Sequence, residues 1–514
     1  MIQKLSGVKL PVGASEQKLY ELARNALRAP VKYFRILKKS LDARDKNKLH
    51  WLYTFEFSAE KQTEKNPLSA LGETREKDKR VLIVGAGPAG LFCAVRLLQW
   101  GMRPVIIERG APVDERERDI RSFFETGKLN ICSNVQFGEG GAGTFSDGKL
   151  NTQTNSRENA EVLRLFAAFG APAEVTYLNK PHVGSDNLKR VIKNIREYIL
   201  RNGGKIFFHT ALEDVETKEG KVISALLSNG EKMPVDDVVL AVGHSARDTF
   251  EMLKRNGACL QQKEFAVGVR IEHLQEKISF SQYGKNYKLL PPADYKLVSH
   301  ADERAAFTFC MCPGGIVMPA ASEEGMVATN GMSNYKRDEK NANSALIVQV
   351  KKEDFKSDDP LAGIAFQRRL ERAAYLAGGG DYVAPAQRVE DFLCSRPSVC
   401  AGEVLPSYAR GVGYTALNSL FPAPITAALM KAISDMDVRL KGFAHPDALM
   451  TGVESRTSSP VRILRGDDGQ SVTLGGLYPC GEGAGYAGGI TSAAADGLRT
   501  ASKLIQKYGG STEA

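Results

Sequence analysis

The chain has 514 residues, 43% of them hydrophobic and 25% charged, so it is long enough for two or three globular domains and is neither disordered nor fibrous. The net charge of +9 is uneven, because 17 basic and 10 acidic side chains give residues 1–79 a charge of +7. A basic surface is therefore expected only on the N-terminal part of the molecule.

Cysteine content and hydropathy predict the compartment. Eight cysteines are too few for a disulfide scaffold and lack the spacing of a zinc-ligand set, so reduced thiols and no metal are expected. No uncharged apolar run approaches the roughly 18 residues of a membrane-spanning helix. Residues 1–10 also lack the apolar core of a signal peptide. These patterns favour a cytoplasmic protein without a membrane span.

Residues 1–60 predict a small basic domain of βαββ type, with Ser15 as the helix cap. Its strand, helix, strand and strand are expected over residues 2–10, 16–28, 31–41 and 49–58. Residues 61–79 are polar and contain few apolar side chains, and we interpret them as a linker.

A dinucleotide-binding βαβ unit follows. Its strand, glycine motif, helix and strand are expected over residues 81–84, 85–90, 91–100 and 104–108. In Gly85-x-Gly87-x-x-Gly90, the first glycine permits a tight turn, the second lets a pyrophosphate approach the backbone, and the third lets helix and strand pack closely. The helix N-terminus adds free N–H groups and a positive dipole end. Glu108 ends the second strand, where it can accept ribose hydroxyls and would repel a 2′-phosphate, which disfavours NADP.

The rest of the pattern predicts an α/β fold, in which an FAD/NAD(P)-binding Rossmann-like domain is split in sequence by an inserted α+β domain. Further elements are expected as a helix over 187–201, a strand over 205–209, a meander over 213–215, 222–228 and 232–234, a buried strand over 237–243, a late strand over 473–480 and a helix over 490–507. The predicted division is the first part of the FAD-binding domain at 80–264, an inserted substrate or cap domain at 265–445, and a return segment at 446–514.

Several features favour FAD over NAD. Arg109 extends the strand end as in flavoproteins, residues 241–243 resemble a small-residue turn of flavoproteins, and Glu482 resembles their late acidic residue, which binds the ribityl chain. A helix N-terminus after that residue would stabilise negative charge on the reduced flavin. A second glycine-rich stretch, residues 137–150, can lie flat against a ring or diphosphate. The residues predicted to bind FAD non-covalently are Gly85, Gly87, Pro88, Ala89, Gly90, Glu108, Arg109, Gly140, Gly141, Gly143, Thr144, Ser146, Gly243, Gly481, Glu482, Gly489 and Ile490.

Residues 138–149, 452–462 and 481–490 together resemble a bacterial family of uncharacterised FAD-dependent dehydrogenases. The resemblance spans nearly the whole chain and includes residues 39–44 in the small N-terminal domain. It implies a flavoprotein fold of the two-dinucleotide-binding-domain superfamily, and it implies no substrate.

Charged side chains near the expected flavin site are the candidate catalytic residues: Glu454, Arg456 and Lys149. An arginine there could bind an anionic substrate or stabilise reduced flavin, and the alternative is a buried Glu–Arg pair that braces two domains.

The remaining candidates are cysteines and histidines. Cys310 and Cys312 have no neighbouring base in the sequence, so packing is favoured for them, as it is for Cys93. Packing or capping is also favoured for His182, whereas for His244 contact with the flavin and packing stay equally open.

The expected function is that of an FAD-dependent oxidoreductase that passes a hydride through flavin N5 to or from an unidentified small substrate. NADH or NADPH is one candidate donor, and a protein donor is the alternative, because no second glycine motif occurs within a βαβ unit. Two other functions stay open: an RNA-modifying flavoenzyme that grips nucleic acid through Lys38, Lys39 and Arg44, and a protein that uses FAD only for structure.

Overall fold

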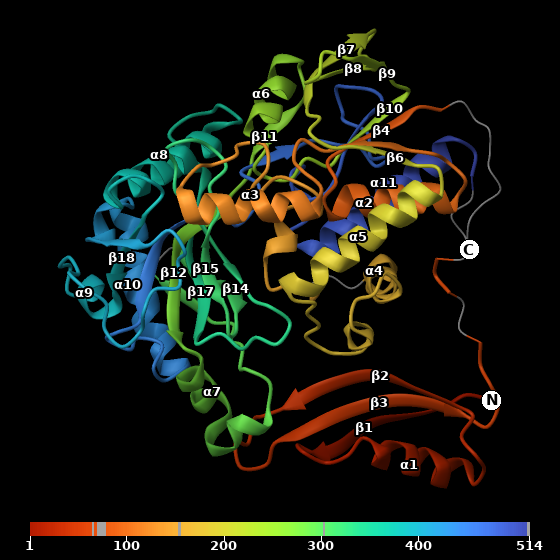
Figure 1. Ribbon diagram of the computed structural model, residues 1–514, viewed down its shortest axis with the longest axis vertical. Helices are drawn as coiled ribbons and strands as arrows, with labels where there is room; N and C mark the ends of the chain where they lie inside the picture. The colour runs from red at the N-terminus through yellow and green to blue at the C-terminus, as the bar shows by residue number, and fades with distance from the viewer. Residues whose placement is uncertain (64–65, 69–78, 153–155, 302–303, 511–514) are drawn as a thin grey trace.

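The computed structural model describes residues 1–63, 66–68, 79–152, 156–301 and 304–510 (Figure 1). Most of the predicted linker, namely residues 64–65 and 69–78, lies outside the described residues. Within the described ranges, no helix is both long enough and apolar enough to cross a membrane.

The N-terminal domain is a βαββ unit, as predicted. Its elements are β1 (Gln3–Pro11), α1 (Gln17–Leu27), β2 (Tyr33–Asp42) and β3 (His50–Ser58). The strands form an antiparallel sheet in the order β1-β3-β2, and α1 packs Leu19 against Phe55 on the side that faces away from the rest of the molecule (Figure 1). The domain docks through Lys39, whose backbone N–H donates to Tyr177 O (2.8 Å) and whose carbonyl accepts from Asn179 N (2.9 Å).

A parallel sheet, here called the nucleotide sheet, has the strand order β22-β10-β4-β5-β6. Its strands are β4 (Val81–Val84), β5 (Val105–Ile107), β6 (Lys205–Phe207), β10 (Asp237–Leu240) and β22 (Leu477–Pro479). One face, with Ile83, packs on α2 (Pro88–Gln99), α4 (Arg157–Ala168), α5 (Ser185–Arg201) and α11 (Ile490–Lys507). The other face, with Leu82, packs on α6 (Arg247–Arg255) and the antiparallel strands β7 (Leu212–Lys218), β8 (Lys221–Leu227) and β9 (Lys232–Pro234). Cover on both faces explains the uninterrupted apolar sequence of β4.

A second sheet has the strand order β13-β14-β17-β12-β20-β18-β19 and is antiparallel except between β18 and β19. Its strands are β12 (Phe265–Leu274), β13 (Val298–Ala301), β14 (Arg304–Cys312), β17 (Asn341–Val350), β18 (Ala384–Arg388), β19 (Val412–Tyr414) and β20 (Leu449–Glu454). Its helices are α7 (Gln275–Tyr283), α8 (Ala362–Ala377), α9 (Val389–Leu393) and α10 (Ala423–Arg439).

Alternation along β12 gives the second sheet two different faces. Val267, Val269 and Ile271 belong to the apolar core formed with α8 and α10. Arg270 and Glu272 project to the opposite face. On that side the short strands β15 (Ile316–Pro319) and β16 (Thr329–Met332) pair with each other, and β16 contacts β12 and β20.

The remaining elements connect these parts. They are α3 (Val113–Thr126), β11 (Leu260–Gln262), β21 (Val461–Ile463) and the single 3₁₀ turns η1 (Ala142–Phe145), η2 (Ala173–Thr176), η3 (Gly284–Leu289), η4 (Lys352–Phe355) and η5 (Leu417–Ser419). The β11–β21 pair joins the segments that enter and leave the second sheet.

Some boundaries differ from the sequence predictions. Helix α2 begins at Pro88 rather than at residue 91, because proline is accommodated in the first turn of a helix. Strand β22 covers only part of the predicted 473–480, since Gly476 has a φ of +75° and leaves the extended conformation. The predicted start of the return segment at residue 446 is too early, because β20 pairs with β12 and β18 in the second sheet.

Candidate functional site

A cavity of about 730 Å³ lies between the nucleotide sheet and the second sheet. One wall consists of the loops that follow β4, β5 and β10, and ligands bind at such carboxyl ends in open parallel sheets. The opposite wall comes from the second sheet and β16, and it includes Thr308, Phe309, Cys310, Met311, Thr329, Asn330 and Glu454. The volume is in the range of cofactor and small-molecule sites.

The first glycine motif shapes the nucleotide end of the cavity. Gly85 has a φ of +104°, and a Cβ there would lie 2.4 Å from Ala241 O, so only glycine fits. A Cβ on Gly90 would lie 2.0 Å from Gly85 O, which accounts for the close packing of α2 on the sheet. Gly87 lines the cavity and caps α2, whose first N–H groups favour an anion.

Glu108 joins the two glycine-rich loops. It is buried just after β5 and lines the cavity. Its carboxylate accepts backbone hydrogen bonds from Ala86 (2.8 Å), Gly110 (3.0 Å) and Gly138 (3.0 Å). A carboxylate has about four acceptor positions, so capacity is left for a ribose hydroxyl. Glu108 therefore has a bracing role that the sequence did not reveal.

Arg116 of α3 holds the second glycine-rich loop, a role that the sequence did not predict. The side chain is fully buried, and its guanidinium donates to the carbonyl oxygens of residues 134, 135, 138, 139 and 141. Burial lowers the pKa of Arg116 to about 10, so the group stays charged at neutral pH. A signal was present, because Arg116 falls in the apolar stripe of α3 with Val113, Ile120 and Phe123.

The return segment contributes a second carboxyl. Glu482 follows β22 and lines the cavity. Burial raises the pKa of Glu482 to about 7, and the nearby Lys263 offsets only part of this rise. Helix α11 begins at Ile490 after Gly489, and both residues line the cavity. The free N–H groups at this helix end favour negative charge in the cavity.

Glu454 provides the carboxyl of the opposite wall, at the end of β20. Burial raises the pKa of Glu454 to about 7, although Arg270 lies 3.7 Å away and Thr329 Oγ1 donates to the carboxylate (3.3 Å). A carboxyl that titrates near neutral pH can give or take a proton in a reaction. The fold thus brings this predicted catalytic residue to the cavity.

The guanidinium of Arg456 also reaches the cavity wall, but it is already paired. Its Nη2 and Nε donate to Glu371 of α8 (2.9 and 3.1 Å), and its Nη1 donates to Ser322. Arg247 of α6 binds the same carboxylate (2.7 Å). Burial raises the pKa of Glu371, but these two arginines hold this pKa well below its usual range. This geometry supports the alternative in which Arg456 braces two parts of the molecule.

Lys149 lines the cavity and is held by residues from both walls. Its Nζ donates to Asp147 (2.7 Å) and to the carbonyl of Met311 on β14. Arg337 pairs with the same Asp147 carboxylate (2.6 Å). Burial raises the pKa of Asp147, but Lys149 and Arg337 hold this pKa well below its usual range.

Most residues predicted to bind the cofactor line the cavity: Gly85, Gly87, Pro88, Ala89, Glu108, Arg109, Gly141, Gly143, Ser146, Gly243, Glu482, Gly489 and Ile490. Arg109 also stacks on Phe137, 4.4 Å from the ring centre. The others do not line it and support the loops from behind: Gly90, Gly140, Thr144 and Gly481. Polar lining residues that no motif revealed include Gln136, Lys180, Asp294, Lys296 and Asn330.

Some of the cysteine and histidine candidates line the cavity, and the others do not. His244 and Cys310 line the cavity, although packing was favoured for Cys310. His182 instead stacks on Tyr335 and hydrogen bonds its carbonyl through Nε2 (3.0 Å). Cys93 lies in the core, as predicted.

The basic residues of the N-terminal domain differ in their environments. Lys39 pairs with Glu16 (2.6 Å), and Arg44 forms two hydrogen bonds to Asp42 (2.8 and 2.7 Å). Lys38 is exposed. Lys39 and Arg44 are therefore paired with carboxylates of their own domain.

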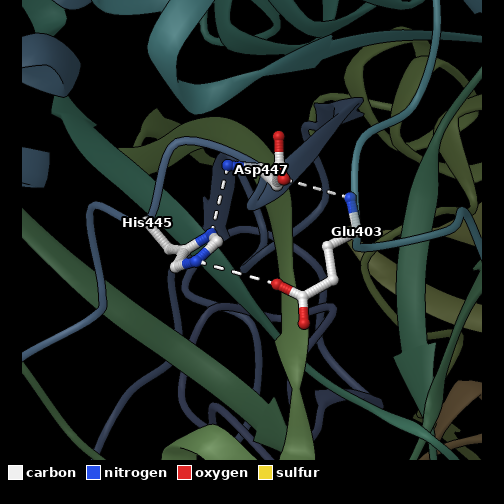
Figure 2. A group of neighbouring side chains, drawn as sticks. All are labelled: Glu403, His445 and Asp447. Atoms are coloured by element: carbon white, nitrogen blue, oxygen red, sulfur yellow. Dashed lines mark hydrogen bonds and ion pairs between the residues drawn. The ribbon is translucent and has the colours of Figure 1, made fainter.

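Away from the cavity, Glu403, His445 and Asp447 place ligand-type atoms close together (Figure 2). Cations already balance both carboxylates, because Lys277 pairs with Glu403 and Arg388 pairs with Asp447 (2.7 Å). His445 Nδ1 accepts a hydrogen bond from the backbone N–H of Asp447 (3.2 Å). We therefore interpret this group as a polar cluster that ties two loops together.

Comparison with solved structures gives weak similarities. A flavin-dependent brominase, Bmp2, is 14% identical, with 84% of this chain and 80% of that chain covered and a TM-score of 0.37. The glycerol-3-phosphate dehydrogenase from Bacillus halodurans complexed with FAD is 11% identical, with 87% and 68% covered and a TM-score of 0.36.

Sequence comparisons are more specific. Residues 264–457 match a family described as FAD-dependent protein, C-terminal domain-like, and residues 78–119 match an FAD binding domain. A protein of Clostridium beijerinckii, described as an uncharacterized protein, is 46% identical over 494 residues, with 92% of each chain covered. These matches identify FAD as the cofactor of the protein. The chain belongs to the family of FAD-dependent proteins that includes this clostridial relative.

Proposed function

We propose that the protein is an FAD-dependent oxidoreductase in which a small substrate exchanges a hydride with the cofactor beside the second sheet. The observation that carries this proposal is the cavity, which joins Gly87 at the nucleotide end to two buried carboxyls, Glu454 and Glu482. Bound FAD would supply the two-electron acceptor and donor, with hydride transfer at N5. In this proposal residues 80–264 and the chain after β20 hold FAD, and β12 to β20 hold the substrate.

The residues present fit FAD. Gly87 and Gly141 expose backbone to the cavity, and a Cβ on Gly87 would have only Gly141 near it, at 3.9 Å. The capped start of α2 suits a diphosphate, and Glu108 retains capacity for a ribose hydroxyl. The start of α11 at Ile490 suits the electron-rich edge of a reduced flavin.

The chain's own groups supply the acid–base chemistry. Glu454 is proposed to hold or accept the substrate proton, because its carboxyl is buried in the wall formed by the second sheet and titrates near neutral pH. Lys149 is proposed to orient an electron-rich substrate group, since its ammonium is anchored at the same wall. Arg456 acts as a positioning residue through Glu371.

The test is an absorbance spectrum of the purified protein, followed anaerobically as NADH and NADPH are added in turn. Oxidised flavin should show bands near roughly 370 and 450 nm, and bleaching by one nicotinamide would identify the donor. Glu454→Gln should retain the flavin and lower its turnover by about 10²-fold or more, whereas Glu324→Gln, at an exposed site, should not. Equal turnover of Glu454→Gln and wild type would refute the acid–base role. A flavin that dithionite reduces but no nicotinamide, protein donor or organic substrate reduces would refute the oxidoreductase proposal.

A further inference from the structure

Cys310 and Cys312 lie at the end of β14, where this strand is irregular. The pairing of β14 with β17 changes register between Phe309 and Cys312, and Cys310 has a φ of +43°. In a regular strand, residues two apart share a face but their side chains are too widely spaced for a disulfide, whose Cβ atoms lie about 3.5–4.5 Å apart. The bulge bends the strand, and Cys312 Sγ donates to the carbonyl oxygen of Cys310 (3.3 Å). Strained backbone of this kind is often found at functional sites.

The two thiols differ in exposure and charge environment. Cys310 lines the cavity, whereas Cys312 is fully buried behind it. Arg270 Nη2 donates to Cys310 O (3.0 Å) and lies 3.7 Å from Cys312 Sγ, and Lys149 binds the carbonyl of Met311 between them. A hydrogen bond from Cys312, with the charges of Lys149 and Arg270, lowers the pKa of Cys310 to about 6, while the pKa of Cys312 is raised. These charges therefore favour a thiolate at Cys310 beside a thiol at Cys312.

We propose that Cys310 and Cys312 form a redox-active dithiol that exchanges two electrons with the bound FAD. As the Cys310–Cys312 bond forms, the thiolate and thiol release two electrons and the one proton of Cys312. Bound FAD would take up the two electrons and the proton, so charge and atoms balance. This inference rests on the proposed function and names its substrate class as dithiols and disulfides.

Cys310, which lies in the cavity wall, connects the pair to a substrate in the cavity. A substrate thiolate attacks Cys310 Sγ, the bond between the cysteines breaks, and Cys312 leaves. The second substrate thiol then attacks the mixed disulfide, which releases Cys310 as a thiolate and the substrate as a disulfide. The proton of that second thiol passes to Cys312, which returns the pair to a thiolate and a thiol. Glu454 is the nearby group that can relay it, because its carboxylate approaches the same Arg270 that contacts both cysteines.

An anaerobic dithionite titration of the flavin-loaded protein tests the pair. The background variant carries serine at the exposed Cys132, Cys394 and Cys400, so that these thiols contribute no mixed disulfides. After incubation with oxidised glutathione and desalting, this protein should take up four electrons per flavin. The same protein with Cys310→Ser should take up two. Uptake of two electrons by the background variant would overturn the proposal.

Peptide mass spectrometry distinguishes failure of the dithiol proposal from failure of the proposed function. The glutathione-treated protein should contain a disulfide between residues 310 and 312, with or without flavin. Iodoacetamide at pH 6 should label Cys310 at least tenfold faster than Cys400 of the wild-type chain, and Cys312→Ser should reduce this difference. A protein that binds no flavin but forms the disulfide would refute only the proposed function. Absence of the disulfide would overturn the dithiol.

Discussion

Replacing Glu454 by glutamine tests whether the cavity wall holds a carboxyl that ionises only at a cost in stability. Burial raises the pKa of Glu454 from 4.5 to about 7, and a rise of this size corresponds to about 3 kcal/mol. Because the pKa in the folded state exceeds that in the unfolded state, the contribution of Glu454 to the free energy of unfolding is fully present below pH 4.5. It is lost as the pH rises through 7. Glutamine has nearly the same shape and carries no charge, so Glu454→Gln should escape this loss.

Urea unfolding followed by circular dichroism at pH 5 and pH 8 measures the difference. The free energy of unfolding of the wild type should fall by about 2–3 kcal/mol more than that of Glu454→Gln over this interval. Glu324→Gln is the matched control, because this side chain is exposed and outside the cavity lining, and it should follow the wild type. Parallel pH profiles for wild type and Glu454→Gln would refute the reasoning.

Three further substitutions test the cofactor end of the cavity. Glu108→Ala removes the acceptor for three backbone N–H groups and should weaken FAD binding at least tenfold, about 1.4 kcal/mol; full flavin occupancy after dialysis would contradict this. Gly85→Ala places a Cβ 2.4 Å from a carbonyl and should yield flavin-poor protein. Gly475→Ala is the control, because it lies outside the cavity lining and its Cβ would have no neighbour closer than 3.6 Å, so it should bind FAD normally; equal flavin content of the two variants would show that the loop can shift. Arg116→Met leaves buried carbonyls without their donor and should cost about 1–3 kcal/mol, seen as a lower thermal midpoint. Arg121→Met, at an exposed site, is its control, and equal midpoints would refute the bracing role.

Local sequence was sufficient to predict those elements whose stabilising contacts lie close together in the sequence. The strand, turn and helix of residues 81–100 follow from apolar periodicity and glycine spacing, and the structure places them as predicted, with the helix start moved to Pro88. Glu108 could be located because it ends the next strand of the same unit. Arg116 was missed although its position in an apolar stripe carried a signal, since an arginine on a helix is usually solvated.

The second wall of the cavity could not be derived in this way. Strand β20 was assigned to the return segment because a six-residue strand carries no mark of its partner, which is β12, more than 170 residues earlier. Arg456 was a candidate for substrate contact until its partner Glu371 was located on α8.

The sequence by itself determined the nucleotide-binding half and the cofactor, because glycine spacing, strand apolarity and helix position act over about 30 residues. The tertiary structure decided which side chains face the cofactor from the opposite wall. Lys149 meets Met311, and Arg270 meets Glu454, only after strands remote in sequence pair across the second sheet. The packing that brings them together also buries them, and removal of water sets the ionisation of Glu454 and Glu482 near neutral pH.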